Sequence, residues 1–362
     1  ARFRIDPVTA RIIRNRGIEG EAAIDRYLNG TLDDLYDPML LKDMERAVSI
    51  LCEAVDTGKK IRIVGDYDID GVCSTYILLQ AFERLGSDVD FEIPDRIKDG
   101  YGINESIIEQ ALADGVEVIL TCDNGISAFH QVELAKKYGM TVVITDHHEV
   151  PLDGEKEKIP PADAVIDPKQ ADCPYPFPEI CGAVVAYKLV QVLYARRGVP
   201  QMEWLDLLEF AAIATVGDVM KLQDENRILV KYGLKKMAQT KNLGLRRLAE
   251  KNNLDLGAIT AYHIGFVIGP CLNAGGRLKT AKEALALLRA QSEEEAERLA
   301  EELKELNDTR KDMTEQGTEA AKLQVESWYQ KDKVLVVFLP ECHESLAGII
   351  AGRLREYYQK PA

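Results

Sequence analysis

The chain has no long hydrophobic run, no paired-cysteine motif and no excess of positive charge. None of its seven cysteines lies in a C-x-x-C pair or has the spacing of a zinc site. No apolar stretch approaches the roughly 20 residues that a membrane-spanning helix needs. A formal net charge of −15 argues against a protein that is basic over its whole surface and binds nucleic acid in that way. A nuclease is still allowed, because metal ions and a local basic groove can hold phosphate in an acidic protein.

The cysteines are expected to be free thiols, since several lie in apolar segments and no disulfide framework is visible. We therefore expect a cytoplasmic protein that does not enter a membrane. The chain starts at Ala1 without an initiator Met and stops at Ala362, where a further strand would begin. These ends lead us to expect a fragment of a longer protein.

What the sequence does contain is an alternation of strand and helix patterns. Runs of apolar, β-branched residues alternate with stretches of helical spacing, which predicts an α/β fold with a mainly parallel sheet. Strands are predicted at 61–65, 89–93, 116–121, 141–145 and 163–167, with helices at 72–85, 104–113 and 128–138.

The sequence divides into four predicted segments. Short helices come first, then the α/β region with a helical C-terminal part, then one long connecting helix, and finally the start of a second α/β domain. The predicted boundaries are 1–45, 46–290, 291–330 and 331–362.

The long helix is predicted from apolar residues at helical spacing between 292 and 328, interrupted at most near Gly317. A strand over Val334–Phe338 and a helix over Leu346–Leu354 would open the second domain.

Acidic and imidazole side chains follow three of the predicted strands. In an open α/β sheet, ligands bind beyond the carboxyl ends of the strands, so these groups should meet at one edge. Such closely packed carboxylates repel one another unless a cation neutralises them. The groups are Asp66, Asp68 and Asp70 after the first strand, Asp123 after the third, and Asp146, His147 and His148 after the fourth.

Each motif has a simpler interpretation when taken alone. Asp66 to Asp70 could form an acidic surface turn, and Asp123 an ordinary strand-to-helix turn. A calcium-binding EF-hand is excluded, because position 77, where its bidentate Glu would stand, is Ile. Asp218 ends an apolar run that predicts a buried helix, and it is either a further ligand or an N-cap.

Carboxylate and imidazole ligands without thiolate favour Mn²⁺ or Mg²⁺ over structural zinc. Two such ions activate a water molecule and stabilise the leaving oxygen of a phosphoester. The residues therefore predict a binuclear metal site that hydrolyses a phosphoester.

These motifs resemble the DHH phosphoesterase superfamily, and within it the exonucleases specific for single-stranded DNA. Further similar motifs run through the whole chain in the same order. They are Asp37-Pro38 with Leu41–Met44, Ile93–Arg96 with Gly100–Gly102, Asp172–Pro176 with Cys181–Ala183, Gly269-Pro270 with Asn273–Leu278, and His343-Glu344 with Gly348–Ala351 and Arg353.

The resemblance implies a role for each residue. Asp66 and Asp68 would bind the first ion, Asp70, His147 and Asp218 the second, and Asp123 would bridge them. His148 would contact the scissile phosphate or help to organise the site, and Asp146 would orient the histidines. Substrate or its phosphates would be bound by Arg96, Tyr101, Asn273 and Arg277 (the last two on a Gly-rich loop), His343 and Arg353.

Simpler roles remain for two of these groups. Arg277 could be a surface arginine after a turn, and His343 could cap a helix.

The resemblance also implies an activity. It is a 5′-to-3′ exonuclease that hydrolyses single-stranded DNA to mononucleotides with two Mn²⁺ or Mg²⁺ ions, in DNA repair and recombination. Single-strand-binding protein and a helicase are the implied protein partners. In this family, 46–290 would be the catalytic domain and 331–362 the start of a DHH-associated domain. The alternatives are a DHH phosphodiesterase for cyclic dinucleotides or short oligoribonucleotides, an inorganic pyrophosphatase, and a non-catalytic DNA-binding relative.

Overall fold

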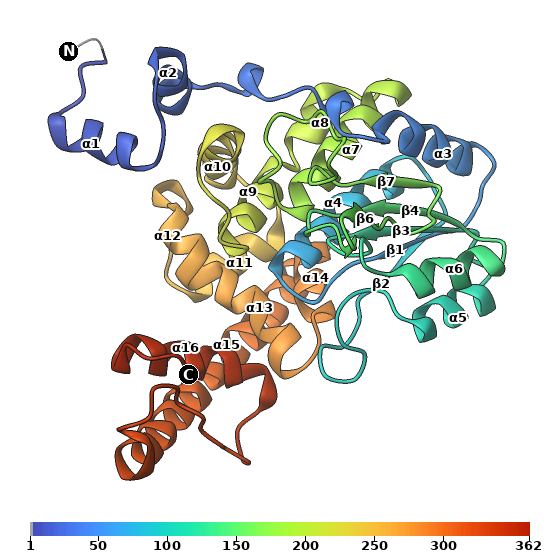
Figure 1. The fold of residues 1–362 in the computed structure, drawn as a ribbon. Coiled ribbons are helices and arrows are strands. Elements are labelled where there is room, and N and C mark those ends of the chain that lie inside the picture. The colour runs from blue at the N-terminus through green and yellow to red at the C-terminus, as the bar shows by residue number, and fades with distance from the viewer. Residues whose placement is uncertain (1–2) are drawn as a thin grey trace.

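The computed structural model describes residues 3–362 (Figure 1). It begins with the helices α1 (Pro7–Asn15) and α2 (Glu21–Asn29) and the 3₁₀ turns η1 (Leu32–Asp34) and η2 (Pro38–Leu40). Asp6 caps α1 by accepting hydrogen bonds from two backbone N–H groups, and Pro7 fixes its first turn. Short helices were predicted here; residues 1 and 2 of that segment lie outside the described residues.

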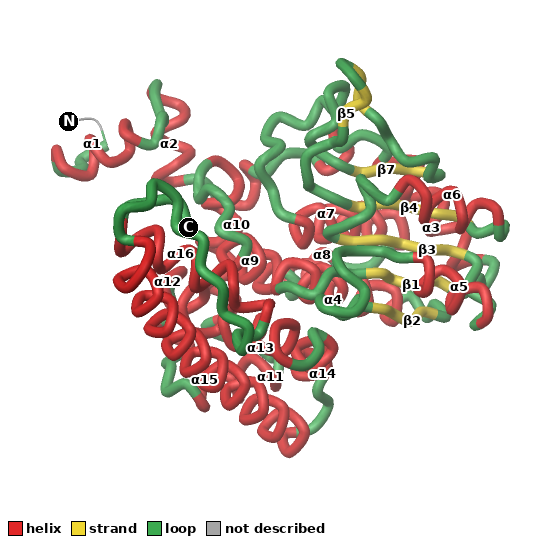
Figure 2. Tube along the Cα trace, turned by 60° about the horizontal axis from the view of Figure 1, so that its bottom comes forward, coloured by secondary structure: helices red, strands yellow, loops and turns green. Residues whose placement is uncertain are grey.

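A five-stranded parallel sheet forms the centre of the α/β region (Figure 2). Its strand order is β2-β1-β3-β4-β7, so the three strands that precede the acidic motifs are neighbours. The prediction of a mainly parallel α/β sheet is confirmed, with every predicted strand within two residues of its observed ends. The strands are β1 (Ile61–Val64), β2 (Val89–Glu92), β3 (Val118–Cys122), β4 (Thr141–Thr145) and β7 (Ala164–Ile166); β5 (Leu152–Asp153) and β6 (Lys156–Glu157) form a separate small hairpin.

Helices cover both faces of this sheet (Figure 1). Alternate residues of each strand point to opposite faces, which divides the apolar core into two clusters. Ile63 and Leu120 belong to one cluster, and Ile119 and Ile144 to the other. The first face is covered by α3 (Met44–Asp56), α4 (Ile69–Arg84) and α7 (Gly182–Arg197), the second by α5 (Glu105–Ala113) and α6 (Phe129–Lys137).

A helical region follows α7 and packs beside α4. Here α9 is mostly apolar and lies against α4, α7 and α10. The elements are α8 (Gln201–Leu205), α9 (Leu208–Gly217), α10 (Asp224–Met237), α11 (Leu243–Lys251), η3 (Leu256–Ala258), α12 (Ala261–His263), the π-helical turn η4 (Ile264–Ile268), α13 (Gly269–Leu278) and α14 (Lys282–Arg289).

One prediction is wrong in this region, because Asn273 and Arg277 lie on the helix α13 and not on a Gly-rich loop. The glycines serve close packing instead: a Cβ at Gly276 would lie 2.2 Å from the carbonyl oxygen of Tyr67. A glycine in a helix costs about 1 kcal/mol relative to alanine, so the sequence pattern argued for a loop. The approach of two distant segments requires the glycine here.

The predicted long helix is present as α15 (Glu293–Gln324), continued by the π-helical turn η5 (Val325–Tyr329). Ser292 caps its N-terminus. The helix runs unbroken through Gly317, where a Cβ would lie 2.5 Å from Cδ1 of Ile350. That glycine gives room to α16 (Ala347–Tyr358), which follows the turn η6 (Glu344–Leu346).

The strand predicted over Val334–Phe338 does not form. Its side chains alternate as in a strand, with Leu335 buried and Val336 and Phe338 exposed. Among the described residues, however, no strand lies beside it, and Leu335 N–H donates only to the carbonyl of Pro361 (2.8 Å). A hydrophobic alternation specifies two faces, but a strand also needs a hydrogen-bonding neighbour.

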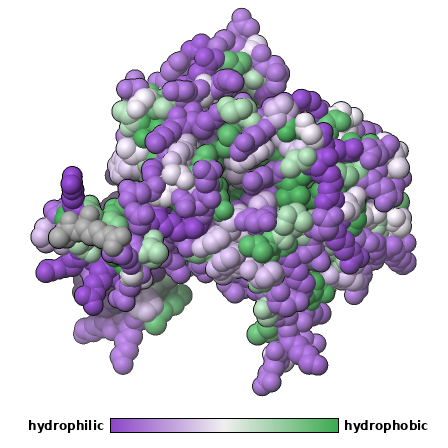
Figure 3. Space-filling model, turned by 90° about the horizontal axis from the view of Figure 1, so that it is seen from above, coloured by the Kyte–Doolittle hydropathy of each residue, from purple (hydrophilic) through white to green (hydrophobic). Residues whose placement is uncertain are grey.

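The surface seen from above is mostly hydrophilic, with scattered apolar patches (Figure 3). Within residues 3–362, no helix is both long enough and apolar enough to span a bilayer.

Candidate metal centre

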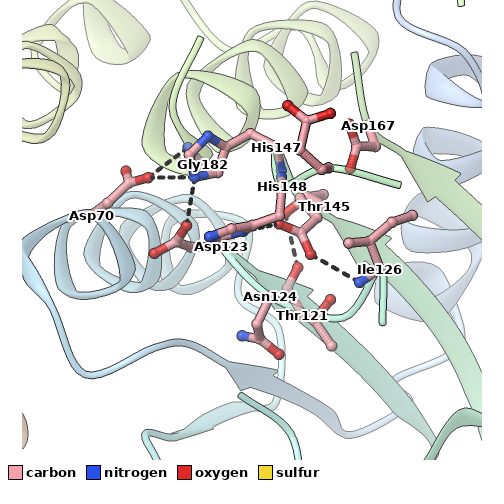
Figure 4. Close-up of polar contacts among 12 residues, drawn as sticks. Asp70, Thr121, Asp123, Asn124, Ile126, Thr145, His147, His148, Asp167 and Gly182 are labelled. Carbon is pink, nitrogen blue, oxygen red and sulfur yellow. Dashed lines mark hydrogen bonds and ion pairs between the residues drawn. The ribbon is translucent and has the colours of Figure 1, made fainter. Parts of the chain in front are cut away.

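The carboxyl ends of β1, β3 and β4 bring the predicted acidic and imidazole groups together (Figure 4). Three triads of side chains each have potential ligand atoms that lie within 4.8 Å of one another. Asp123 and His147 each belong to two of these triads, so the groups form one continuous cluster. The triads are Asp66, Asp68 and Asp123; Asp70, His147 and Asp218; and Asp123, His147 and His148.

His147 lies at the centre of this cluster. Its Nε2 atom is 3.0 Å from Oδ1 of Asp123, 3.4 Å from Oδ2 of Asp70 and 4.0 Å from Oδ2 of Asp218. Three carboxylates thus converge on one ring nitrogen, and the cluster joins residues 70, 123, 147 and 218 across the fold.

The first acidic motif is shaped by the start of α4. Asp68 caps this helix, with Oδ1 accepting from the N–H groups of Asp70 (2.9 Å) and Gly71 (3.1 Å). A Cβ at Gly71 would lie 2.3 Å from the carbonyl oxygen of Asp66, so only glycine fits here. The cap and the glycine fold the chain so that all three carboxylates stay at the strand end.

Asp70 is held by the N-terminus of α7. Its Oδ2 accepts from Gly182 N–H (2.7 Å) and its Oδ1 from Ala183 N–H (2.8 Å). Free N–H groups and the helix dipole both stabilise a negative charge at this position. Sequence reasoning missed this role of residues 182 and 183, because the contact joins segments more than 100 residues apart.

Asp123 adopts a left-handed backbone conformation, with φ of 61°. Asn124 beside it fixes the turn: its Nδ2 donates to the carbonyls of Val64 (3.0 Å) and Cys122 (2.9 Å). Asn124 thereby ties the ends of β1 and β3 together, a role more specific than the strand-to-helix turn considered from sequence.

Asp146 orients His148. Its Oδ1 lies 2.8 Å from Nδ1 of His148, and its Oδ2 accepts from Ile126 N–H (2.8 Å). The hydroxyl of Tyr101 donates to the carbonyl of Asp123 (2.7 Å) and lies 3.1 Å from Nδ1 of His148. Tyr101 and His148 line a cavity of about 120 Å³ beside the cluster.

Asp218 ends α9 as its C-cap and does not cap a following helix, so that alternative is wrong. Its side chain is 30% exposed, more than those of Asp70 and Asp123. The site is therefore open to solvent on the side of α9.

Burial and mutual repulsion raise the pKa of Asp66, Asp123 and Asp218. The pKa of Asp66 rises to about 7 through burial and then through the charge of Asp68. Burial and then Asp70 raise the pKa of Asp218 to about 7. Burial, followed by the charges of Asp70 and Asp68, holds the pKa of Asp123 well above its ordinary value.

The two histidines differ in charge. Burial lowers the pKa of His147, which favours the neutral imidazole that binds metals. Burial also opposes a charge on His148. The hydrogen bond that Asp146 accepts from it, together with the charges of Asp146, Asp70 and Asp218, outweighs burial and raises the pKa of His148 to about 9. The cluster therefore offers one neutral imidazole as a ligand and one cation for a phosphate.

These residues fit divalent cations. Oδ1 of Asp66 and Nδ1 of His147 are buried without a hydrogen-bond partner, an arrangement that costs free energy. Cations would also remove the repulsion that raises the carboxyl pKa values. The donor set is carboxylate oxygen and imidazole nitrogen, which suits Mn²⁺ or Mg²⁺.

The structure also brings Arg96, Asn273 and Arg277 beside the first acidic motif. The guanidinium of Arg96 lies 4.0 Å from the ring centroid of Tyr67. Oδ1 of Asn273 accepts from Ile69 N–H (2.8 Å), so Asn273 supports the motif itself.

His343 and Arg353 lie farther along the chain, at η6 and on α16. Arg277 reaches this region by donating to the carbonyl of Ser345 (3.0 Å). His343 Nδ1 lies 2.8 Å from the Ser345 hydroxyl, and Arg353 is exposed. Among residues 3–362, no hydrogen bond or ion pair joins either residue to the metal cluster.

Sequence reasoning missed Asp167, which follows β7 at the same edge of the sheet. This side chain is fully buried, and its Oδ2 has no hydrogen-bond partner. Burial and then the charge of Asp146 raise the pKa of Asp167 to about 7. Its position as the last residue of the predicted strand 163–167 was the signal that could have identified it.

Residues 60–215 match the model of the DHH family, N-terminal domain. The exonuclease RecJ in a manganese-bound crystal structure superposes with a TM-score of 0.78 at 33% identity, over 88% of this chain and 79% of that one. The chain belongs to the DHH family, as the motifs at the strand ends predicted.

Within this family, the chain is similar to single-stranded-DNA-specific exonucleases named RecJ. It is 36% identical to that of Bacillus subtilis (strain 168) over 99% of this chain and 44% of the relative. It is 35% identical to that of Escherichia coli (strain K12) over 99% of this chain and 63% of the relative. RecJ from Thermus thermophilus in complex with Mn²⁺ matches with a TM-score of 0.77 and 30% identity, over 98% of this chain and 52% of that one. The chain thus spans 44% to 63% of the length of these curated relatives.

Proposed function

We propose that this chain is the catalytic core of an exonuclease that hydrolyses single-stranded DNA from the 5′ end to mononucleotides. The observation that carries the proposal is the cluster of carboxylates and imidazoles from four chain segments, centred on Asp123 and His147, in a chain similar to RecJ over 99% of its length. The 5′-to-3′ direction rests on the resemblance alone.

Two divalent cations, when bound, would supply Lewis-acid activation of water and charge neutralisation at the phosphorus. We propose that Asp66 and Asp68 hold one ion, Asp70, His147 and Asp218 the other, and Asp123 both. Each member of this set lies in one of the three triads.

The remaining residues would bind and orient the DNA. His148 is charged at neutral pH and fixed by Asp146, so it can donate a hydrogen bond to an oxygen of the scissile phosphate. Arg277 and Arg96 lie beside the first acidic motif, where they can hold phosphate oxygens. Tyr101, Asn273, His343 and Arg353 complete the proposed substrate contacts.

The domain organisation is part of the proposal. Residues 46–290 would form the catalytic domain behind the N-terminal segment 1–45. Residues 291–330 would connect it to a DHH-associated domain that begins at 331–362. A role in DNA repair and recombination, partners such as single-strand-binding protein and a helicase, and a cytoplasmic location belong to the same proposal. The free state of all seven cysteines is consistent with that location.

A second candidate is a DHH phosphodiesterase for cyclic dinucleotides or short oligoribonucleotides, because the same metal chemistry would cleave them. A non-catalytic DNA-binding relative is disfavoured, since every expected ligand is present.

The test uses single-stranded DNA labelled at the 5′ or the 3′ end, duplex DNA and cyclic dinucleotides, each with and without Mn²⁺. We expect Mn²⁺-dependent release of mononucleotides from the 5′ end of single strands. The matched control is Asp123→Ala, expected to abolish cleavage while leaving the circular dichroism spectrum unchanged. Equal attack on both ends, or turnover of cyclic dinucleotides alone, would refute the proposal.

A further inference from the structure

Four arginines that lie from the first acidic motif to α16 have no carboxylate partner, although the chain carries 60 acidic residues. In the part of the chain that the structure describes, Arg96, Arg277, Arg310 and Arg353 form no ion pair. Nε of Arg96 is buried without any hydrogen-bond partner. Arg96, Arg277 and Arg353 were predicted from the sequence as substrate-binding residues, whereas Arg310 was not.

Arg310 occupies the inward face of α15. It belongs to a stripe with Leu303, Asn307 and Thr314, which are 0%, 1% and 0% exposed. Residues spaced by three or four lie on one side of a helix, so the half-buried Arg310 stands where an apolar side chain would continue the core. Its Nε donates to Oδ1 of Asn307 (3.0 Å), and the rest of its guanidinium has no hydrogen-bond partner among the described residues.

Packing on both sides fixes the place of Arg310. Before Arg310, α15 contacts α13 at two points. A Cβ at Gly275 would lie 3.4 Å from Leu303, and Asn307 Nδ2 lies 3.4 Å from Cys271 Sγ. After Arg310, Gly317 of α15 packs against Ile350 of α16. Arg310 therefore stands between the helix that carries Arg277 and the helix that carries Arg353.

Arg96, Arg277, Arg310 and Arg353 together are called the arginine row. The charges of neighbouring members of this row affect one another. Burial, then Arg96 and Arg310, lower the pKa of Arg277, while Asp68 acts in the opposite direction. Burial and then Arg353 lower the pKa of Arg310. Arginine does not lose its proton in proteins, so only an anion can relieve this repulsion.

We propose that Arg310 binds a phosphate group of the substrate other than the one that is cleaved, in a site shared with Arg277 and Arg353. This inference rests on the proposed function and names a further contact of the same substrate. A guanidinium suits this role, because it donates two parallel hydrogen bonds to phosphate oxygens. The phosphate is either the terminal monoester of the strand or an internal diester.

The experiment compares Arg310→Gln and Arg310→Lys with the wild type by fluorescence anisotropy of a labelled single strand in EDTA, over a series of salt concentrations. Arg310→Gln should bind about tenfold more weakly, as expected for a lost hydrogen bond to a charged group. Its slope of log K against log salt should fall by about 0.7, the value for one phosphate contact on a single strand. Arg310→Lys keeps the charge and should restore the slope but not the full affinity.

The matched control is Arg355→Gln, an exposed arginine on α16 that lies outside the row. It should leave affinity and slope unchanged. Oligonucleotides with a 5′-phosphate or a 5′-hydroxyl distinguish a terminal phosphate monoester from an internal phosphodiester as the group that Arg310 binds. A loss confined to the phosphorylated strand identifies the terminal phosphate, and an equal loss on both identifies an internal one.

The proposal is overturned if Arg310→Gln behaves as Arg355→Gln does, or if Arg310→Lys loses as much slope as Arg310→Gln, which would indicate a structural role. Failure of the proposed function gives a different result, namely a wild-type protein that neither binds nor cleaves single strands. A nucleoside 5′-monophosphate then serves as the probe, and equal thermal stabilisation of wild type and Arg310→Gln would overturn the role of Arg310.

Discussion

At the residue scale, Asp123 joins the two parts of the metal cluster. It shares one triad with Asp66 and Asp68 and another with His147 and His148. It is buried, has a left-handed backbone, and its pKa is raised first by burial and then by Asp70. A carboxylate held under such strain and repulsion is unfavourable for folding, and a bound cation would compensate it.

Replacing Asp218 by Asn should stabilise the metal-free protein at neutral pH. Burial and then Asp70 raise the pKa of Asp218 from 3.8 to about 7, so the folded chain keeps this proton to higher pH than the unfolded chain. The stability linked to this group is fully present below the unfolded pKa and is lost as pH rises toward 7. In EDTA, we expect the unfolding temperature of the variant to match wild type at about pH 4 and to exceed it at about pH 8.

In saturating Mn²⁺ at about pH 8, the wild type should have a higher unfolding temperature than Asp218→Asn. The reason is that the wild type would bind the ion more tightly and gain more stability from it. Calorimetric scans with and without metal give both comparisons. A difference in unfolding temperature between the two proteins that stays constant across the pH series would contradict the raised pKa of Asp218.

At the scale of elements, the N-terminus of α7 positions the cluster. The N–H groups of Gly182 and Ala183 hold Asp70, and Gly182 also lies directly against Asp123. One helix end therefore fixes two carboxylates that come from different strands.

Gly182→Ala should weaken metal binding. The new Cβ would lie 2.7 Å from the Cβ of Asp123, so Asp123 or α7 must move. We expect Mn²⁺ affinity to fall by about 10- to 100-fold, the usual effect of disturbing groups that support a ligand. Overpacking should lower the free energy of unfolding by about 1–3 kcal/mol. Titration calorimetry and urea unfolding measure the two effects.

The matched control is Gly352→Ala in α16, where a Cβ meets nothing within 4 Å. It should leave Mn²⁺ affinity unchanged and stabilise the helix by about 0.5–1 kcal/mol. Unchanged affinity in Gly182→Ala would show that the cluster tolerates movement of α7.

At the scale of the whole molecule, a buried polar network ties the N-terminal segment to the helical region. Lys188 and Glu225 are 1% and 0% exposed and form an ion pair of 3.1 Å. Lys188 also donates to the carbonyl of Tyr36 (3.1 Å), and the Tyr175 hydroxyl donates to Glu225. The network joins α7, α10 and two loops that are distant in sequence.

Glu225→Gln should destabilise the protein by about 3–5 kcal/mol, because it leaves Lys188 as a buried charge without its counter-ion. Urea unfolding of the metal-free protein measures this loss. The control is Glu179→Gln, which removes an exposed pair with Lys221 and should cost about 0–1 kcal/mol. Equal effects of the two substitutions would mean that the buried pair is replaceable by hydrogen bonding alone.

The sequence by itself determined the strands and the positions of the acidic motifs. In a parallel sheet, residues that follow neighbouring strands must come to one edge, so Asp66, Asp123 and Asp146 could be placed together by local pattern alone. The long helix was likewise predicted from residue 292, directly before the observed start of α15, because helical spacing is a local pattern.

Only the tertiary structure decided the contacts between distant segments. The glycines of α13 favoured a loop, whereas the structure has a helix in which Gly276 packs against Tyr67. Val334–Phe338 has a strand pattern but lacks a neighbour to pair with among the described residues. The hydrogen bonds from α7 to Asp70 and the arginine row through Arg310 likewise could not be predicted from the sequence. Periodicity and capping act within a few residues, whereas these contacts depend on how whole elements pack against each other.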